Sequence, residues 1–489
     1  MAELSWRGTW WSAEEPEVTC PGTLHCADGG YLRLELIGGF DVTVRTPLPS
    51  GNGYGISEDS RDFPIIHGTS GSTLFTLLGN HAIHTRGSGF LGGEITEQNW
   101  SSNRALRGVH LPSLEESLFI RSHMRLERLL HWSNRSSFDL SRLLEDGKAT
   151  GERQVDTHAV EPVTAVHNGM NISLRLLTDD FNIQHKPISN ERLLKATERA
   201  ALTFSPPEPT PYNSFDKIHK DMQDLLTLCS YAPCGSHGRS LVYELPEATS
   251  NSSQRLKEVE VIGRQVYRTE KDKEESQSRD FLFTLAEVDF AELAPRWLAL
   301  KEKSRMGCDI LFGLRYISNG YVGTRLLGVA SAAESIHASL RSASTPLPKA
   351  QYRSLKRKLL AAIADEPEDL QEFVKTGLRN NPTYNERMLE LASIPDSEAV
   401  DLLLTDRKSW AKMLRNARND LAHANERVSQ NPESTPAYWL LETTYALLCL
   451  VLMTELGISR EKQRAALDHP RIRMASRKFK RELSRHSSG

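Results

Sequence analysis

Residues 418–423, with the sequence RNDLAH, combine side chains that can act together on a phosphodiester. A histidine such as His423 has an unperturbed pKa of about 6.5, so it can accept or donate a proton at neutral pH. An arginine such as Arg418 keeps a permanent planar charge that binds phosphate through two hydrogen bonds. The segment therefore has residue types that are competent to cleave a phosphodiester.

The segment lies in residues 406–427, where apolar residues recur every three or four positions, and this spacing predicts an amphipathic helix. Asn419 and His423 are four residues apart and share a face that points away from the apolar stripe. Arg418 lies at the edge of that face. The helix thus presents a cation, an amide, a carboxylate (Asp420) and an imidazole together, although a solvated face without function fits the spacing equally well.

Spacing alone does not single out this pair, because an arginine precedes a histidine by five residues at three other places: Arg153/His158, Arg464/His469 and Arg481/His486. Only the pair at 418 and 423 has Asn-Asp directly after the arginine and a long amphipathic helix around it. The others lie in a strand-rich region, before a proline, or in a terminal tail that tends to fray.

The pattern along the chain changes near residue 288. Before it, short apolar runs alternate with polar residues, as in 32–37, and predict strands. We also expect helices at 114–132 and 215–228, and a hairpin formed by 259–267 and 281–285. After it, a period near 3.6 predicts one helix at each of these ranges: 290–316, 320–341, 350–364, 367–378, 383–393, 397–404, 406–427, 434–456 and 460–485. These patterns predict an α+β protein with a β-rich domain at 1–288 and a helical domain at 290–489.

Composition describes an ordinary globular chain of 489 residues with a net charge of −3. Such a charge gives no general attraction to nucleic acid or anionic membranes. The start has no secretory signal. The apolar run 446–453 is shorter than the roughly 20 residues that span a bilayer, so it predicts a buried helix. The six cysteines do not form a disulfide scaffold in a chain of this length. We therefore expect a cytoplasmic protein without a membrane partner.

The 418–423 motif resembles the Arg-x4-His motif of HEPN domains, on the penultimate long helix of a helical bundle. Residues 332–337 (AAESIH) are similar to a stretch on an earlier helix of the ApeA-like branch of these domains. In the N-terminal half, 8–11 (GTWW), 22–24 (GTL) and 126–132 (LERLLHW) resemble the ApeA N-terminal domain. The resemblance thus covers most of the chain.

The resemblance implies a β-rich, sandwich-like N-terminal region that senses or regulates, followed by an all-α HEPN nuclease domain. It also implies metal-independent RNA cleavage, with no cofactor, that leaves a 2′,3′-cyclic phosphate. Arg418 and His423 would be catalytic, and Asn419 would orient the phosphate or His423. Asp420 would position His423 or Arg418 or make a structural pair. Glu334 would act in the same way from a neighbouring helix, or have a structural role.

The resemblance further implies anti-phage defence by abortive infection, with tRNA as a plausible substrate and a phage-encoded trigger or inhibitor. HEPN domains usually pair, and one histidine per chain leaves no separate acid and base, so we expect a homodimer through the helical domain. The alternative is a non-catalytic HEPN module that binds RNA or protein. A metal-dependent hydrolase fits less well, because the site lacks a carboxylate cluster.

Two other groups of residues are candidates. A basic C-terminal stretch can bind RNA phosphates or can form a solvated helix end: Arg471, Arg473, Arg477, Lys478, Lys480 and Arg481. Cys20 and Cys26 with His25, and Cys229 and Cys234 with His237, suggest zinc half-sites. Their spacings differ from the usual two-residue knuckle, which favours buried free thiols.

Overall fold

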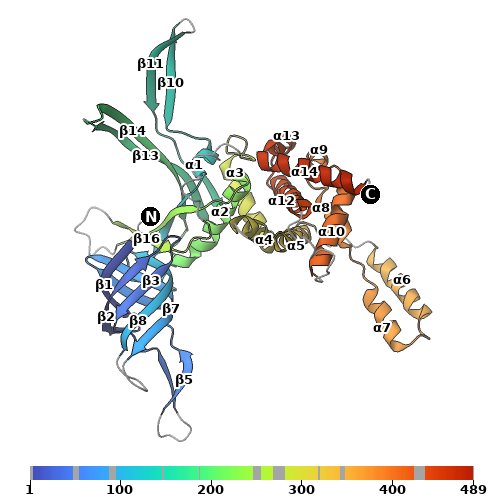
Figure 1. Ribbon diagram of the computed structural model, residues 1–489, viewed down its shortest axis with the longest axis horizontal. Coiled ribbons are helices and arrows are strands. Elements are labelled where there is room, and N and C mark those ends of the chain that lie inside the picture. The colour runs from blue at the N-terminus through green and yellow to red at the C-terminus, as the bar shows by residue number, and fades with distance from the viewer. Residues whose placement is uncertain are drawn as a thin grey trace. The chain divides into compact units, whose positions relative to one another are not determined.

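The computed structural model describes residues 4–47, 54–87, 95–145, 148–186, 188–245, 255–267, 281–317, 320–341, 347–422 and 435–487 (Figure 1). The chain forms two compact units. The β unit comprises Met1–Leu226, Cys234–Ser278 and Phe290–Ala294, and the helical unit comprises Thr227–Pro233, Arg279–Asp289 and Pro295–Gly489. The α+β class, with a β-rich N-terminal part and an all-α C-terminal part, is confirmed.

Six strands of the β unit close into a barrel: β1 (Leu4–Ser12), β2 (Glu15–Cys26), β3 (Leu32–Ile37), β8 (Ile95–Arg107), β7 (Thr73–Gly87) and β6 (Ile65–Ser70). Each strand is antiparallel to its neighbours, and β7 and β6 return the order to β1. A separate hairpin is formed by β4 (Thr43–Pro47) and β5 (Tyr54–Ser60). The expectation of a β-rich N-terminal region is confirmed, but these six strands form a closed barrel and not a sandwich-like pair of sheets.

The barrel interior is filled by large apolar side chains. In β3 the predicted alternation is observed, with Leu34 fully buried while its neighbours Arg33 and Glu35 point outward. Trp10 is also fully buried in this core. Its ring passes over Gly68 on the paired strand β6, where a Cβ atom would lie 2.1 Å from the indole. Glycine at this position therefore allows the barrel to contain a tryptophan.

The barrel continues into an open sheet through one shared strand. Residues 97–102 of β8 pair with β3, and residues 104–107 of the same edge pair with β16 (Leu256–Gly263). From β16 the sheet continues through β15 (Ser236–Glu244), β9 (Phe119–Leu126), β14 (Glu191–Ser205), β13 (Met170–Lys186) and β12 (Val163–His167). The barrel and the open sheet are therefore one continuous hydrogen-bonded system.

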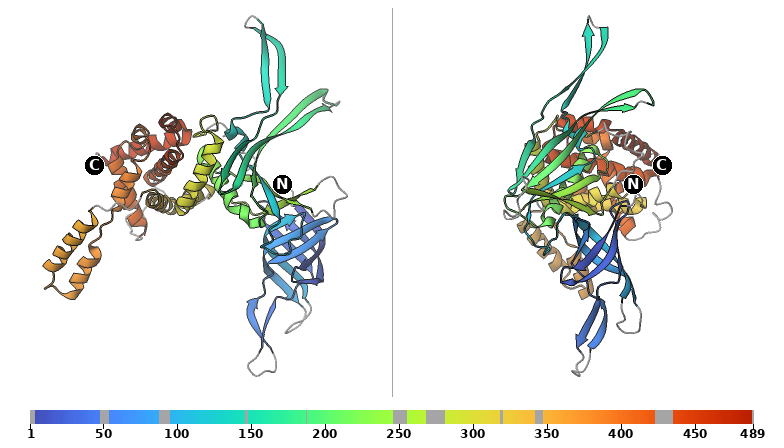
Figure 2. Two further views of the ribbon diagram at one scale, coloured as in Figure 1. Left: turned by 180° about the vertical axis from the view of Figure 1, so that it is seen from behind. Right: turned by 90° about the vertical axis from the view of Figure 1, so that its left-hand side faces the viewer.

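One face of the open sheet is covered by α2 (Asp216–Ser230), as predicted for 215–228. His219 of α2 is buried, lies 3.0 Å from the Ser122 hydroxyl of β9, and packs on Phe204 of β14. Asp216 forms ion pairs with Arg104 and Arg239. Beyond the sheet, the ribbon of β10 (Phe138–Glu145) and β11 (Lys148–Thr157) and the outer halves of β13 and β14 project outward (Figures 1 and 2).

The helical unit contains α3 (Phe290–Lys303), α4 (Arg305–Tyr316), α5 (Val322–Leu340), α6 (Lys349–Ala362), α7 (Glu368–Gly377), α8 (Tyr384–Leu391), α9 (Ser397–Leu404), α10 (Arg407–Ala422), α12 (Thr435–Glu455), α13 (Arg460–Ala465) and α14 (Pro470–Ser487). The first five residues of α3 belong to the β unit. α12 packs against α5, α9, α10, α13 and α14.

Among the described residues α12 alone is long and apolar enough to cross a membrane. However, 78% of its most apolar stretch is buried in the protein, as predicted for 446–453.

A buried charge cluster ties three of these helices together. Glu442 of α12 accepts two hydrogen bonds, of 3.1 and 3.2 Å, from Arg315 of α4, and lies 3.7 Å from Arg325 of α5. The Arg315 guanidinium also lies over the rings of Tyr231 and Tyr445, 4.6 and 3.8 Å from their centroids. Aromatic faces and a carboxylate thus compensate a cation that is buried in the core.

Three predictions of local structure were wrong. Residues 119–126, expected in a helix, form strand β9 with partners on both edges, because tertiary pairing overrides a short apolar period. Residues 281–285 form no strand; Leu282 and Phe283 are buried individually, and β16 pairs with β15 and β8. The stretches 290–316 and 460–485 each divide into two helices, before Arg305 and before Pro470.

Candidate functional site

The helix that carries the RNDLAH motif, α10, is anchored by its first half. Its start is capped by Asp406, whose carboxylate accepts hydrogen bonds from the hydroxyl and backbone N–H of Ser409. These bonds lower the pKa of Asp406. Trp410 and Leu414 are fully buried, and the Trp410 indole donates a 3.0 Å hydrogen bond to Thr444 of α12. The predicted apolar stripe therefore fixes the helix while its last turn is more exposed.

The structure describes three of the four predicted residues of the motif. Arg418 is half-buried, Asn419 is exposed, and Asp420 is half-buried. His423 lies outside the described residues, which stop at residue 422 and resume at residue 435. The exposure of Asn419 matches the expectation that it lies on the polar face of the helix.

Arg418 is held by Glu334, which the sequence analysis had placed on a neighbouring helix. The Arg418 guanidinium lies 3.5 Å from one carboxylate oxygen of Glu334, on α5. The other carboxylate oxygen lies 2.7 Å from Arg387 of α8. Arg418 also donates a 3.3 Å hydrogen bond to the side-chain oxygen of Asn419. A single carboxylate therefore connects the arginines of two helices and fixes the direction of Arg418.

Tyr384 supports Arg418 from a second side. The guanidinium carbon lies 5.6 Å from the centroid of the Tyr384 ring, within the range of a cation–π contact. The Tyr384 hydroxyl donates a hydrogen bond of 3.2 Å to the backbone oxygen of Ala330 on α5. Burial and the nearby Glu334 raise the pKa of Tyr384, so its hydroxyl stays protonated at neutral pH. The ring thus supports Arg418 as a neutral group.

A second contact between α5 and α8 lies one helical turn away. The His337 Nε2 atom is 2.8 Å from a carboxylate oxygen of Glu390, and His337 is 5% exposed. Glu334 and His337 are three residues apart on α5, and Arg387 and Glu390 are three residues apart on α8. The Glu334–Arg387 and His337–Glu390 contacts therefore lie one helical turn apart along the same pair of helices. They hold α5 and α8 together next to Arg418.

Asp420 has no part in this network. Within the described ranges its side chain makes no hydrogen bond or ion pair, and the carboxylate that Arg418 contacts belongs to Glu334. The positioning of Arg418 is thus supplied from another helix, whereas the predicted action of Asp420 on His423 involves a residue outside the described part.

Tyr384 and Arg387 were missed by the sequence reasoning. They are three residues apart and share a face of the helix predicted at 383–393, and an arginine on an inward face is a signal of a buried or shared carboxylate. However, no spacing rule connects that face with Glu334 or Arg418, which lie roughly 30 to 50 residues away. Only the packing of α5, α8 and α10 brings these side chains together.

The basic C-terminal residues lie along α14, which buries Ile472, Ala475 and Phe479 on its other face. Arg473, Arg477 and Arg481 follow one another at four-residue spacing, and with Pro470, Met474 and Lys478 they line a hollow of about 260 Å³. Within the described part of the chain, none of the six predicted basic residues forms an ion pair with a carboxylate. This face can therefore accept phosphate without first breaking an ion pair.

The cysteines were the predicted metal candidates. Cys20 and Cys26 lie six positions apart on the extended strand β2, which separates them by roughly 20 Å. Cys229 and Cys234 are both buried. Among the described residues, no three His, Cys, Asp or Glu side chains are grouped to hold a metal ion.

Comparison with known families gives two matches. The model described as ApeA N-terminal domain 1 matches residues 5–297, and the model described as Apea-like HEPN matches residues 327–462. The second match includes Glu334, Tyr384, Arg387 and Arg418 and ends before α14. Neither the comparison with curated proteins nor that with solved structures found a match. The predicted resemblance of both halves is confirmed.

Proposed function

Because the chain belongs to the ApeA N-terminal domain 1 family and carries an ApeA-like HEPN domain, we propose that this anti-phage defence protein is a metal-independent endoribonuclease. The observation that carries the proposal is the Arg418 guanidinium. It is held by Glu334 and Tyr384, stays 38% exposed, and lies at the start of an Arg-x4-His motif. Such a cation is oriented before any substrate arrives.

Each residue has a role that follows from its chemistry. Arg418 has five N–H donors, so contacts with Glu334 and Asn419 leave donors for the charge that develops on a pentacoordinate phosphate. His423 takes the proton of the ribose 2′-OH or gives one to the 5′-oxygen leaving group. Attack by the 2′-oxygen leaves a 2′,3′-cyclic phosphate. Asn419, exposed one helical turn before His423, orients the phosphate.

The catalytic unit in this proposal is a homodimer. General acid and general base catalysis in one step needs two proton-transfer groups, and each motif supplies one histidine. Two helical domains facing each other provide both His423 side chains and both Arg418 side chains. Six of the basic residues of α14, Arg471, Arg473, Arg477, Lys478, Lys480 and Arg481, would add contacts to RNA phosphates.

In the cell, such an enzyme would act in the cytoplasm by abortive infection. It would cut RNA, with tRNA as the substrate class, once a phage-encoded trigger or inhibitor changes its state. The β unit is the natural place for restraint and sensing, because it accounts for more than half of the chain and lies outside the HEPN match.

The experiment that tests the proposal is cleavage of a total tRNA pool in EDTA by the wild type, Arg418→Ala and His423→Ala. We expect both variants to lose at least about a hundredfold in rate, as when a main transition-state contact is removed. Arg415→Ala is the matched control, because Arg415 lies on the same helix and, among the described residues, bonds only to its neighbour Asn416. Mapping of product ends should find cyclic phosphates.

The same samples distinguish the proposal from a non-catalytic RNA- or protein-binding module. That alternative is favoured by the contacts of Arg418 with Glu334 and Tyr384, which also suit a structural network. It predicts that Arg418→Ala and His423→Ala disturb assembly or binding and leave any cleavage unchanged. If no sample cleaves, the assay is repeated with a lysate of phage-infected cells to supply a trigger. A monomeric mass by light scattering with full activity would contradict the dimer.

A further inference from the structure

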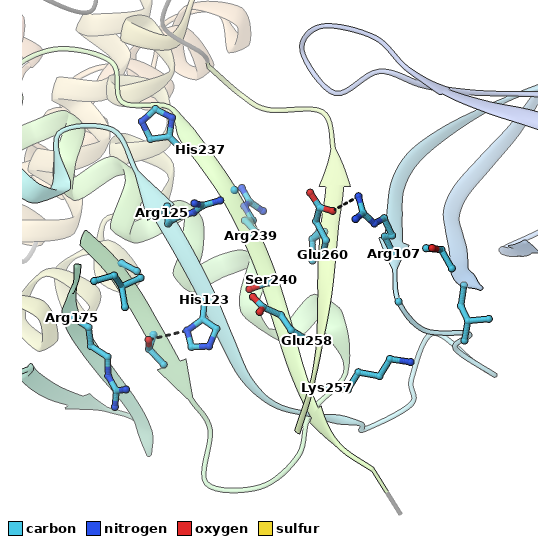
Figure 3. A pocket seen from close by; sticks show the side chains of 18 of the residues that line it. Arg107, His123, Arg125, Arg175, His237, Arg239, Ser240, Lys257, Glu258 and Glu260 are labelled. Carbon is cyan, nitrogen blue, oxygen red and sulfur yellow. Dashed lines mark hydrogen bonds and ion pairs between the residues drawn. The ribbon is translucent and has the colours of Figure 1, made fainter. Parts of the chain in front are cut away.

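The β unit contains a pocket of about 840 Å³ that lies over the open sheet (Figure 3). Its lining comes from β7, β8, β9, β13, β14, β15 and β16, together with the turn before β7. The volume falls in the range of roughly 300 to 1,000 Å³ that is typical of small-molecule sites. It lies on the sheet face opposite the one that α2 covers, since His123 and Ser122 alternate along β9 and Ser122 contacts α2.

The floor of the pocket follows from the strand register. One row of paired residues runs across the sheet from Thr203 through His123 and Ser240 to Glu260 and Arg107. The hydroxyl of Thr203 lies 3.0 Å from His123 Nδ1. Small side chains and hydroxyl groups thus leave room above the sheet and offer hydrogen bonds to a ligand.

Two arginines flank this row. Arg175 pairs with Ala201, and Arg125 pairs with Gly238, so each has a small residue beside it. A Cβ atom on Gly238 would lie 2.9 Å from the Arg125 guanidinium, which shows that this side chain extends across the neighbouring strand. Figure 3 shows Arg125, His123 and Arg175 along one side of the pocket.

The charge of the lining is opposite to that of the whole chain. Arg239 directs its guanidinium to Asp216 of α2 on the other face, so the permanent charges among the other described lining residues are four cations, Arg107, Arg125, Arg175 and Lys257, and two carboxylates, Glu258 and Glu260. Arg107 is 3.0 Å from Glu260, and Arg239 is 3.6 Å from Asp216. By contrast, Arg125 and Arg175 have no carboxylate partner within the described ranges. Two arginines without counter-ions in a concave site attract an anion.

We propose that this pocket binds a small phosphorylated ligand of nucleotide size, with Arg125 and Arg175 holding its phosphate groups. Guanidinium groups match phosphate oxygens through paired hydrogen bonds, and the hydroxyl of Ser240 can add a further donor. The lining residues that the structure describes include no Phe, Tyr or Trp. Sites for single-stranded nucleic acid usually stack bases on such rings, so a small ligand fits the pocket better than an RNA strand.

The test is isothermal titration calorimetry of the full-length chain in EDTA with ATP, inorganic triphosphate and adenosine. We expect both phosphorylated probes to bind and adenosine to bind at least about tenfold more weakly. Arg125→Gln and Arg175→Gln should each weaken ATP binding at least about tenfold. The matched control is Arg33→Gln, an exposed arginine of the barrel strand β3, and it should bind ATP as the wild type does.

Gly238→Ala keeps both arginines and displaces only Arg125, so it should weaken ATP binding in the same direction while thermal unfolding stays close to that of the wild type. Three results would overturn the proposal. They are no heat from either phosphorylated probe at about 1 mM, equal binding of adenosine and ATP, or unchanged binding in both arginine variants. Selective binding of a short RNA in place of ATP would also overturn it, by identifying a nucleic-acid surface. The readout needs no cleavage, so it does not depend on the proposed nuclease.

Discussion

Glu442 and Glu334 each hold two arginines in the helical unit, and their clusters differ in exposure. The Arg315 and Glu442 side chains are only 8% and 7% exposed, and two tyrosine rings surround the guanidinium. The Glu334 and Arg418 side chains are 28% and 38% exposed. A closed cluster of this kind holds helices together, because no ligand can reach its charges. An open cluster keeps a cation directed and accessible, which a phosphate-binding site needs.

The largest effect should come from breaking the closed cluster. Glu442→Ala leaves Arg315 charged and buried without its carboxylate, so we expect the free energy of unfolding to fall by about 3 to 5 kcal/mol. Urea unfolding followed by far-UV circular dichroism measures this loss. Glu398→Ala is the control, because Glu398 is 60% exposed and its ion pair with Arg464 should contribute at most about 1 kcal/mol. Equal losses in the two variants would contradict the comparison.

The open cluster should respond in activity more than in stability. Glu334→Gln keeps the shape of the side chain but removes the charge that orients Arg418 and Arg387. We expect RNA cleavage to slow about tenfold, which corresponds to roughly 1.4 kcal/mol in the transition state. The unfolding midpoint should change little, since these side chains are partly solvated. A large loss of stability with normal cleavage would show that Glu334 is purely structural.

A smaller effect is expected from the six basic residues of α14 between 471 and 481, which have no carboxylate partner in the described part of the chain. Replacing Arg473, Arg477 and Arg481 with glutamine in the His423→Ala background should weaken tRNA binding and lower its salt dependence. The slope of log K against log salt concentration should fall by up to about 2, at roughly 0.7 for each phosphate contact. Filter binding at several salt concentrations measures the slope. If the slope does not change, these cations only form a solvated helix end.

The smallest effect concerns His219, a buried titratable group of the β unit. Burial, reinforced by Arg239 and Arg104, lowers the pKa of His219 well below its ordinary value, so the folded state keeps it neutral. The unfolded chain takes up this proton below about pH 6.5, and the stability of the β unit should therefore fall as the pH drops below that value. His219→Gln should flatten this dependence when urea unfolding is measured at pH values on both sides of it. An identical pH slope would exclude His219 as a cause.

The helical unit was predictable because its signals are local. The apolar period and the prolines predicted α9 with the bounds 397–404 that the structure shows. They also predicted the buried positions of Trp410 and Leu414 on α10. Glu334 was expected beside the motif from the family resemblance, and the structure shows its contact with Arg418. The roles of Arg418, Asn419, Asp420 and His423 remain predictions.

What the sequence did not reveal depends on contacts between distant residues. Strand β9 has a helix-like apolar spacing, and only its pairing with β14 and β15 decides its conformation. Closure of the barrel requires β7 to meet both β6 and β8. In the same way, Tyr384 approaches Arg418, and Arg125 and Arg175 line one pocket, only after the chain has folded. The spacing of apolar residues along the chain does not predict such contacts between distant residues.

Strand β8 limits how this family can change during evolution. One edge of β8 pairs with β3 along its first part and with β16 along its last part. If the chain were divided between the barrel and the open sheet, each of the two parts would be left with an unpaired strand edge. The two parts must therefore be inherited together. The hairpins β4–β5 and β10–β11 pair only with themselves among the described strands. A change in the length of either hairpin would therefore leave the hydrogen bonds of the large sheet intact.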